Sequence, residues 1–244
     1  MLNYKKRIDF FIFARNFYMK KLIYFISFIC ITTVSKAQIH EIGVFAGGSN
    51  YIGDIGSELY INPTNLMGGI IYKYNLNPRM ALRGTFTYAK ISADDAKASN
   101  IGRQQRGLRF SNTLTELAAG IEYSYFPYNL NTHHLTQTPY ILLEIAALNF
   151  NNVIGENGPL QYQYGSKTTV AIPFGLGYKF KVARGFAMAF EIRTTYTFTD
   201  ELDYNNSKIP ALTFGNPNNN DWYTFTGVSF VYTFGRPPCY ATPY

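Results

Sequence analysis

Apolar and polar positions alternate along much of this chain, and the alternation predicts β-strands. Between positions 185 and 198, every second residue from Phe186 to Phe198 is bulky except Thr194, and the residues between them are small or charged. Successive side chains of a strand point to opposite faces, so such a strand has one apolar and one polar face. The same period of two predicts strands at about 41–49, 66–76, 79–91, 113–125, 140–150, 170–180, 185–198 and 222–234.

The polar faces of these predicted strands carry charges that a soluble β-protein would not place in its core. A soluble sandwich or lipocalin-like barrel needs apolar residues inside, because charges are almost never fully buried without partners. A membrane-spanning barrel has the opposite arrangement, with apolar residues facing lipid and polar residues facing the interior. The pattern therefore predicts an all-β fold, an eight-stranded antiparallel transmembrane β-barrel of the outer membrane. The charged residues expected inside are Glu41, Lys73, Arg83, Glu116, Glu122, Glu144, Lys179, Glu191 and Arg193.

Connections between the predicted strands alternate in length, which is typical of outer-membrane barrels. Short turns are expected at 77–78 and 182–184, and long loops at 50–65, 92–109, 151–167 and 199–221. Short turns face the periplasm and long loops face the outside in this architecture. The connection 126–139 is a longer periplasmic one that contains His133 and His134, but no cysteine or carboxylate follows at metal-ligand spacing. No metal site is predicted there.

The N-terminus predicts a signal peptide over residues 1–37. Met19, Lys20 and Lys21 precede an apolar run at 22–34, and the sequence then reads Ser-Lys-Ala before Gln38. A membrane-anchoring helix is the alternative, but the run is short for a bilayer span. An over-extended gene start is one interpretation of residues 1–18. The predicted organisation is a signal peptide at 1–37, a barrel at 38–234 and a periplasmic C-terminal tail at 235–244.

Removing the signal peptide changes what the charge of the chain implies. The whole chain has a formal net charge of +7, but seven of its 22 Lys and Arg lie in the first 37 residues, with one of its 15 Asp and Glu. The remainder is close to neutral and lacks the basic patch that indicates a nucleic-acid partner. Outer-membrane lipid is the expected surroundings of the barrel.

The charged interior has a structural and a chemical interpretation. Glu116 and Glu122 could act as a general acid and base or mark a proton path. An eight-stranded interior is only wide enough for side chains, so we expect the five carboxylates and four cations to form one hydrogen-bonded network. No Gly-x-Ser-x-Gly elbow or other nucleophile context is present. The chain is therefore predicted to be no enzyme and to need no cofactor.

Four sequence segments resemble the PorG family. They are Gln38–Gly56, which includes Ala46-Gly-Gly-Ser-Asn-Tyr-Ile-Gly-Asp54, then Tyr60–Pro63, Arg103–Gly107 and Phe214–Tyr223, which ends in Asn220-Asp-Trp-Tyr223. That family is the small outer-membrane β-barrel component of the type IX secretion system, an export machinery associated with gliding motility. The resemblance spans essentially the whole exported chain. It implies a non-catalytic assembly role, in which the barrel anchors or organises a periplasmic ring built from a lipoprotein and its partner subunit.

The C-terminal tail also resembles the family, where a Pro-Cys-Tyr word often precedes a second cysteine. Here that second position is Ala241, so Cys239 is the only cysteine after the signal peptide, which contains Cys30. The predicted partner-binding residues are Pro237, Pro238, Cys239 and Tyr240. The resemblance implies a disulfide or close contact between Cys239 and the ring lipoprotein, and an unpaired thiol is the alternative.

A second function from another class is a stand-alone barrel that acts in surface adhesion or ligand binding through its long outer loops. The loop 92–109 is rich in Asp, Lys and Arg. These charges could bind an acidic surface or could simply be solvated.

Overall fold

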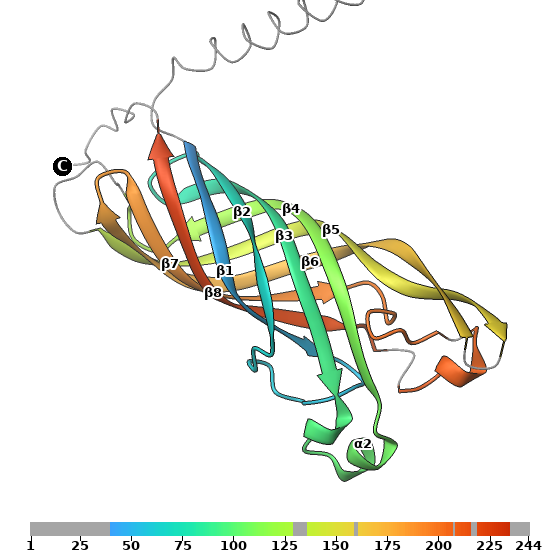
Figure 1. Ribbon diagram of the computed structural model, residues 1–244. Coiled ribbons are helices and arrows are strands. Elements are labelled where there is room, and N and C mark those ends of the chain that lie inside the picture. Colours follow the sequence, from blue (N-terminus) through green and yellow to red (C-terminus); the bar gives the residue numbers. More distant parts are fainter. Residues whose placement is uncertain (1–39, 129–135, 159–160, 207, 216–218, 235–244) are drawn as a thin grey trace, which may run out of the picture. The chain divides into compact units, whose positions relative to one another are not determined.

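A closed antiparallel barrel forms the part of the chain that the computed structural model describes, residues 40–128, 136–158, 161–206, 208–215 and 219–234. Each strand pairs with its neighbours in the sequence, and β1 pairs with β8 to close the ring (Figure 1). The strands are β1 (His40–Ile52), β2 (Asn65–Asn75), β3 (Met80–Asp94), β4 (Arg109–Ser124), β5 (Gln137–Gly158), β6 (Gln161–Ala183), β7 (Phe186–Thr197) and β8 (Trp222–Phe234). The predicted fold class is confirmed.

The outer surface of the barrel is apolar along its strands. Leu117 on β4 is 65% exposed and Ile145 on β5 is 68% exposed. The residues immediately before and after each of them point inward and are buried. Leaving a large aliphatic side chain in water costs about 1.5–3 kcal/mol relative to burying it. Lipid removes that cost, so this surface suits a membrane-spanning barrel.

Aromatic rings gather at both ends of the apolar surface. At one end, His40 at the start of β1 stacks on Phe234 at the end of β8 and contacts Tyr74. At the other end, Trp222 lies 4.7 Å from Tyr196, measured between ring centroids. Such girdles mark the two membrane interfaces of outer-membrane barrels.

The two ends of the barrel differ in their connections. We call the end that carries the β2–β3 and β6–β7 connections the turn end and the opposite end the loop end. At the turn end, the side chain of Asn77 accepts hydrogen bonds from the backbone N–H groups of Arg79 and Met80, both at 2.9 Å. Gly185 has φ of +79°, a left-handed conformation that favours glycine in the β6–β7 turn. Both predicted short turns are present.

Within the described residues, the connections at the loop end contain three short helices. These are η2 (Asp95–Lys97) and α2 (Ile101–Arg106) between β3 and β4, and η3 (Pro210–Leu212) between β7 and β8. Asn100 caps α2 by accepting from the N–H groups of Gly102 and Arg103. Among the described residues, no helix is long and apolar enough to cross a membrane.

The prediction of a long loop at 151–167 is wrong. Strands β5 and β6 continue through this segment as a two-stranded hairpin, with Asn151 paired to Ser166 and Gly158 to Gln161. β4 stops pairing with β5 at Phe150, and β7 pairs with β6 only from Ala171. The hairpin therefore projects beyond the closed ring at the loop end (Figure 1). The alternation of apolar and polar residues ends at the membrane boundary. The main-chain hydrogen bonds between β5 and β6 do not depend on that alternation, so the pairing continues.

Candidate functional site: the charged barrel interior

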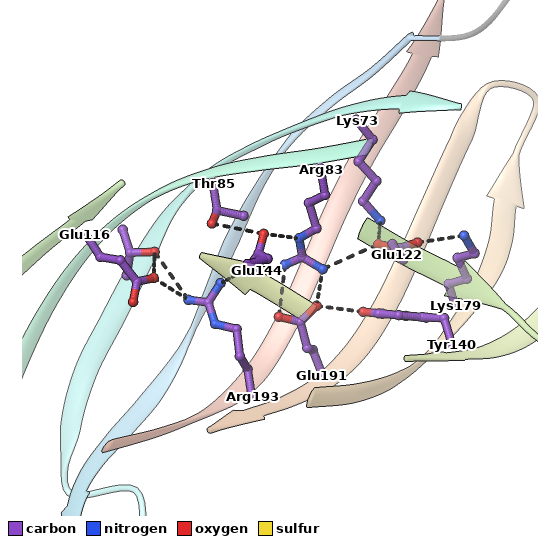
Figure 2. Close-up of polar contacts among 11 residues, drawn as sticks. Lys73, Arg83, Thr85, Glu116, Glu122, Tyr140, Glu144, Lys179, Glu191 and Arg193 are labelled. Atoms are coloured by element: carbon purple, nitrogen blue, oxygen red, sulfur yellow. Dashed lines mark hydrogen bonds and ion pairs between the residues drawn. The ribbon is translucent and has the colours of Figure 1, made fainter. Parts of the chain in front are cut away.

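All nine charged residues predicted to face the interior lie inside the barrel. Their exposed fractions range from 1% for Glu116 to 6% for Lys179. Figure 2 shows that those other than Glu41 come from strands β2 to β7 and point toward one another. Buried charges need partners, so the contacts between them decide whether the interior is stable.

Arg83 on β3 is at the centre of the network. Its guanidinium donates two hydrogen bonds to Glu191 on β7, from Nη1 to Oε2 at 2.7 Å and from Nη2 to Oε1 at 3.0 Å. The same guanidinium lies 3.4 Å from Glu122 and 3.5 Å from Glu144. Tyr140 donates from its hydroxyl to Oε2 of Glu191 at 2.8 Å. One cation therefore links three carboxylates that belong to three different strands.

Glu122 on β4 joins two lysines toward the turn end. Its Oε2 lies 2.6 Å from Nζ of Lys73, and its Oε1 accepts from Nζ of Lys179 at 2.7 Å. The ammonium of Lys179 also lies over the ring of Tyr128, 4.7 Å from the ring centroid. A cation over an aromatic face is attracted by the ring quadrupole, so Tyr128 covers the network at this end.

Arg193 on β7 connects the network to the loop-end half of the interior. Its Nη1 lies 3.5 Å from Glu144 and its Nη2 lies 3.5 Å from Glu116. The guanidinium is enclosed by the rings of Phe45 and Phe225, at 5.4 Å and 5.6 Å from their centroids. Tyr223, Thr87 and Thr85 add further bonds, with the hydroxyls of Tyr223 and Thr87 donating to Glu116 and that of Thr85 to Glu144.

Glu41 is separate from the ion pairs of the other eight residues. Its Oε1 accepts from Nδ2 of Asn75 at 2.8 Å. The remaining four carboxylates and four cations balance in formal charge. Such a paired set is costly to break, because removing one member leaves another charge buried without compensation.

Other described side chains pack beside this network in the interior. At the turn end, a space of about 10 Å³ is lined by Asn75, Tyr128 and Lys179, among others, which is near the minimum for one water molecule. Toward the loop end, the inward positions hold an apolar cluster that includes Phe45, Ile71, Leu148, Phe150 and Phe225. The interior therefore consists of a charged layer and an apolar layer, both filled by side chains.

A polar cap covers the loop end. The hydroxyl of Tyr51 on β1 donates to Asp203 at 2.9 Å and also contacts Asp221. Asp221 accepts from the backbone N–H of Leu202 at 3.0 Å, and Leu202 is fully buried. Leu202, Asp203 and Asp221 of the β7–β8 connection thus lie over the barrel mouth.

Burial raises the pKa values of the carboxyl groups in this cap. The pKa of Asp203 is raised to about 6 by burial, and that of Asp200 to about 7 by burial and by the nearby Asp203. Burial, with the charge of Asp203, also raises the pKa of Asp221 well above its usual value. The cap therefore favours protonated carboxyl groups.

Arg106 holds the β3–β4 connection against the β1–β2 connection. Its guanidinium pairs with Asp95, with Nε 2.9 Å from Oδ2, and donates to the backbone oxygen of Asp54 at 2.6 Å. Burial raises the pKa of Asp95, but hydrogen bonds from Arg106, Gly56 and Leu108 outweigh it and hold that pKa below its usual value. Arg103 donates to the backbone oxygen of Gly56 at 2.9 Å.

Described residues from all four segments that resemble the PorG family contact one another in this cap. Tyr51 from the first segment contacts Asp221 from the fourth, and Arg106 from the third binds the Asp54 backbone of the first. Asn50 donates from Nδ2 to the backbone oxygen of Tyr60, in the second segment, at 3.2 Å. Segments that are distant in the sequence therefore contact one another in the fold.

A family model with the description "Domain of unknown function (DUF6089)" matches residues 20–243. The chain belongs to the DUF6089 family. A search of curated proteins finds no match to it.

Several solved structures are similar to this DUF6089 chain. Neisserial surface protein A is 11% identical with a TM-score of 0.45, over 80% of this chain and 97% of that one. The N-terminal β-barrel domain of Pseudomonas aeruginosa OprF is 16% identical with a TM-score of 0.42, over 81% and 100%. Ail of Yersinia pestis, solved with the heparin analogue sucrose octasulfate, is 13% identical with a TM-score of 0.42, over 81% and 99%. The closed strand order by itself defines the barrel fold.

The predicted tail residues Pro237, Pro238, Cys239 and Tyr240 lie outside the described residues of this DUF6089 chain, as do His133 and the predicted signal peptide. Within the described ranges, no group of three or more His, Cys, Asp or Glu could hold a metal ion.

Sequence reasoning missed the aromatic residues of the interior. Tyr140, Tyr223 and Phe225 point inward and are at most 2% exposed. In β8, the inward-facing Tyr223 and Phe225 follow the outward-facing Trp222, so both faces of the strand are aromatic there and the alternation loses its contrast. The register of Phe225 opposite the inward-facing Arg193 is a signal that could have identified Phe225.

Proposed function

We propose that this DUF6089 barrel is a non-catalytic outer-membrane component of the type IX protein secretion and gliding machinery, which anchors or organises the periplasmic lipoprotein ring. The observation that carries this proposal is the convergence at the loop-end cap of all four segments that resemble the PorG family. Sequence segments that resembled a family only by chance would not be expected to contact one another in the fold.

The filled interior supports a role in assembly over one in transport or catalysis. The described side chains of the charged layer around Arg83 and of the apolar layer around Phe225 occupy the interior, and the carboxylates of the network are engaged by cations. A barrel without a free interior acts through its outer surfaces and its ends. The same features favour the structural interpretation of Glu116 and Glu122 over acid–base chemistry.

The outer membrane is the proposed location, with the turn end in the periplasm. The apolar strand surface and the two aromatic girdles support insertion in a bilayer, and short turns face the periplasm in this architecture. β8 ends at Phe234 on the turn end, so the tail after it would begin on the periplasmic side.

The proposed partners are the ring lipoprotein and its ring partner subunit, bound through the tail. Cys239 would form a disulfide with the lipoprotein, and Pro237, Pro238 and Tyr240 would contribute to the contact. The support for this contact is the resemblance of the tail to the PorG family.

A stand-alone adhesive or ligand-binding barrel is the second candidate. It is favoured by the projecting β5–β6 hairpin, whose β6 edge from Gln161 to Thr168 pairs with no strand other than β5 within the described chain. An exposed strand edge is a template for pairing with another polypeptide. This function would need no periplasmic ring.

Purification of the full chain from native membranes in mild detergent separates the two candidates. Under the assembly proposal, ring subunits co-purify, loss of the barrel impairs secretion, and the barrel band on non-reducing gels shifts on reduction in the wild type but not in Cys239→Ser. Absence of ring subunits together with normal secretion would overturn the assembly role. A band that never shifts while the ring still co-purifies would remove the disulfide alone.

A further inference from the structure

A notch in the barrel wall lies at the loop end, beyond the first residue of β2. β2 begins at Asn65, which pairs with Ser49, whereas β1 continues to Ile52 and β3 continues to Asp94. Between the Ser49–Asn65 pair and the loop end, no strand therefore bridges β1 and β3, and the connection 53–64 crosses the gap. Asn65 closes its floor by donating from Nδ2 to the hydroxyl of Ser92 at 2.8 Å. A cavity of about 460 Å³ remains in the notch.

The cavity wall is rich in hydroxyl, amide and cationic groups. Asn62, Thr64, Ser92, Ser111, Lys97 and Arg109 are among the residues that line it. Ser111 and Arg109 alternate with inward-facing Asn112 and Phe110 on β4, so their side chains lie on the outer side of the barrel. The cavity is within the size range of small-molecule sites, and its lining joins these outward-facing residues to the inward-facing Tyr51 and Phe110.

The two cations of the cavity are available for a ligand. Within the described chain, Lys97 and Arg109 form no ion pair, although seven other lysines and arginines do. Asp94 also lines the cavity, but its Oδ1 accepts from the backbone N–H of Ala96 at 3.0 Å and caps η2. Guanidinium and ammonium groups beside hydroxyls and amides match a phosphorylated sugar, which carries both an anion and hydroxyl donors.

An apolar rim borders this polar cavity. Leu59, Tyr60 and Ile61 in the crossing connection are 60%, 68% and 53% exposed, and Leu66 at the start of β2 is 85% exposed. Asn50 holds the rim in place by donating to the backbone oxygens of Leu59 and Tyr60, both at 3.2 Å. A contiguous exposed apolar segment marks contact with a membrane or partner. A free sugar is too polar to gain from contact with this apolar rim, whereas the acyl chains of a lipid would pack against it.

We propose that the notch cavity binds the phosphorylated sugar headgroup of an outer-leaflet glycolipid. Lys97 and Arg109 contact the phosphate, Asn62, Thr64, Ser92 and Ser111 contact sugar hydroxyls, and the rim at 59–61 lies against the acyl chains. This site is independent of the tail and of the proposed secretion role.

The test uses the full exported chain in phosphatidylcholine nanodiscs that contain graded amounts of bisphosphorylated lipid A, with bound lipid counted by native mass spectrometry. The double variant Lys97→Gln, Arg109→Gln should weaken lipid A binding by about tenfold or more. Each cation near a membrane surface contributes electrostatic attraction to an anionic headgroup, and the two losses multiply in the affinity. Lys208→Gln is the matched control, since Lys208 is an exposed loop-end cation that does not line the cavity. Heat-modifiable migration on gels verifies that each barrel is folded.

Two further arms identify the ligand. Ser111→Phe, which fills the cavity without changing charge, should also reduce lipid A binding, and lipid A without phosphates should bind no better to the wild type than to the double variant. The acyl-free phosphorylated disaccharide should bind at least about tenfold more weakly than lipid A. Unchanged binding in the double variant, equal loss in Lys208→Gln, or equal affinity for the acyl-free disaccharide would overturn the glycolipid site.

Discussion

Arg83 on β3 and Glu191 on β7 connect opposite walls of the barrel through a bidentate pair, with donor–acceptor distances of 2.7 Å and 3.0 Å. Three strands lie between β3 and β7 in either direction around the ring, so this pair is a strut across the interior. Two parallel N–H···O bonds fix the orientation of both side chains as well as their distance. The other ion pairs of the charged layer attach to this strut through Glu122 and Glu144.

Breaking the strut from one side should destabilise the barrel strongly. Arg83→Met leaves Glu191 without its main partner and should cost about 3–5 kcal/mol of unfolding free energy. Urea unfolding of the barrel in lipid vesicles measures this change. Lys208→Met, at an exposed loop position, should change stability by about 0.5 kcal/mol or less. Equal effects of the two substitutions would contradict a stabilising role for the network.

The filled interior should carry no ion current. Phe45, Phe225 and Leu148 occupy the loop-end half, and Tyr128 covers Lys179 at the turn end. Eight-stranded barrels have interiors that side chains fill, unlike the wider porins. In planar bilayers, the reconstituted chain should therefore show only baseline conductance. Regular single-channel steps from folded protein would show that the interior opens.

The membrane itself explains how much of this structure the sequence could predict. A strand that crosses the bilayer must place apolar residues outward, so the period of two identified all eight strands and the inward positions of Arg83, Glu122 and Arg193. Beyond the membrane that requirement ends, which is why the hairpin at 151–167 was mistaken for a loop. The partners of each charge could not be predicted, because pairs such as Arg83 with Glu191 depend on the closure of the ring.

Stability of the loop-end cap should fall as pH rises. The pKa of Asp203 is raised to about 6, and that of Asp200 to about 7, so protonation favours the folded cap. A group with a raised pKa contributes its full stabilisation below its unfolded pKa of about 3.9 and loses it as pH rises through the folded value. Tyr51 has one hydroxyl proton and two carboxyl partners, so a protonated carboxyl group supplies the second hydrogen bond.

Hydrogen exchange at 199–206, corrected for intrinsic rates, should show protection falling between about pH 5 and pH 8. Asp203→Asn keeps the shape of the side chain but cannot ionise, so protection in this variant should depend less on pH. A wild-type cap whose protection rises across this interval would contradict the assignment.

Replacing Arg106 should release the β3–β4 connection from the rest of the loop-end cap. Arg106→Leu removes the pair with Asp95 and the bond to the Asp54 backbone, and should destabilise the cap by about 1.5–3 kcal/mol, the range for hydrogen bonds to a charged group. Arg106→Lys should restore only part of this, because an ammonium cannot reproduce the fork geometry of a guanidinium. Limited proteolysis within 95–108 measures the opening, with Lys97→Gln as a control that leaves these bonds intact. Protease resistance in Arg106→Leu equal to that of the wild type would show that Arg106 does not hold the connection.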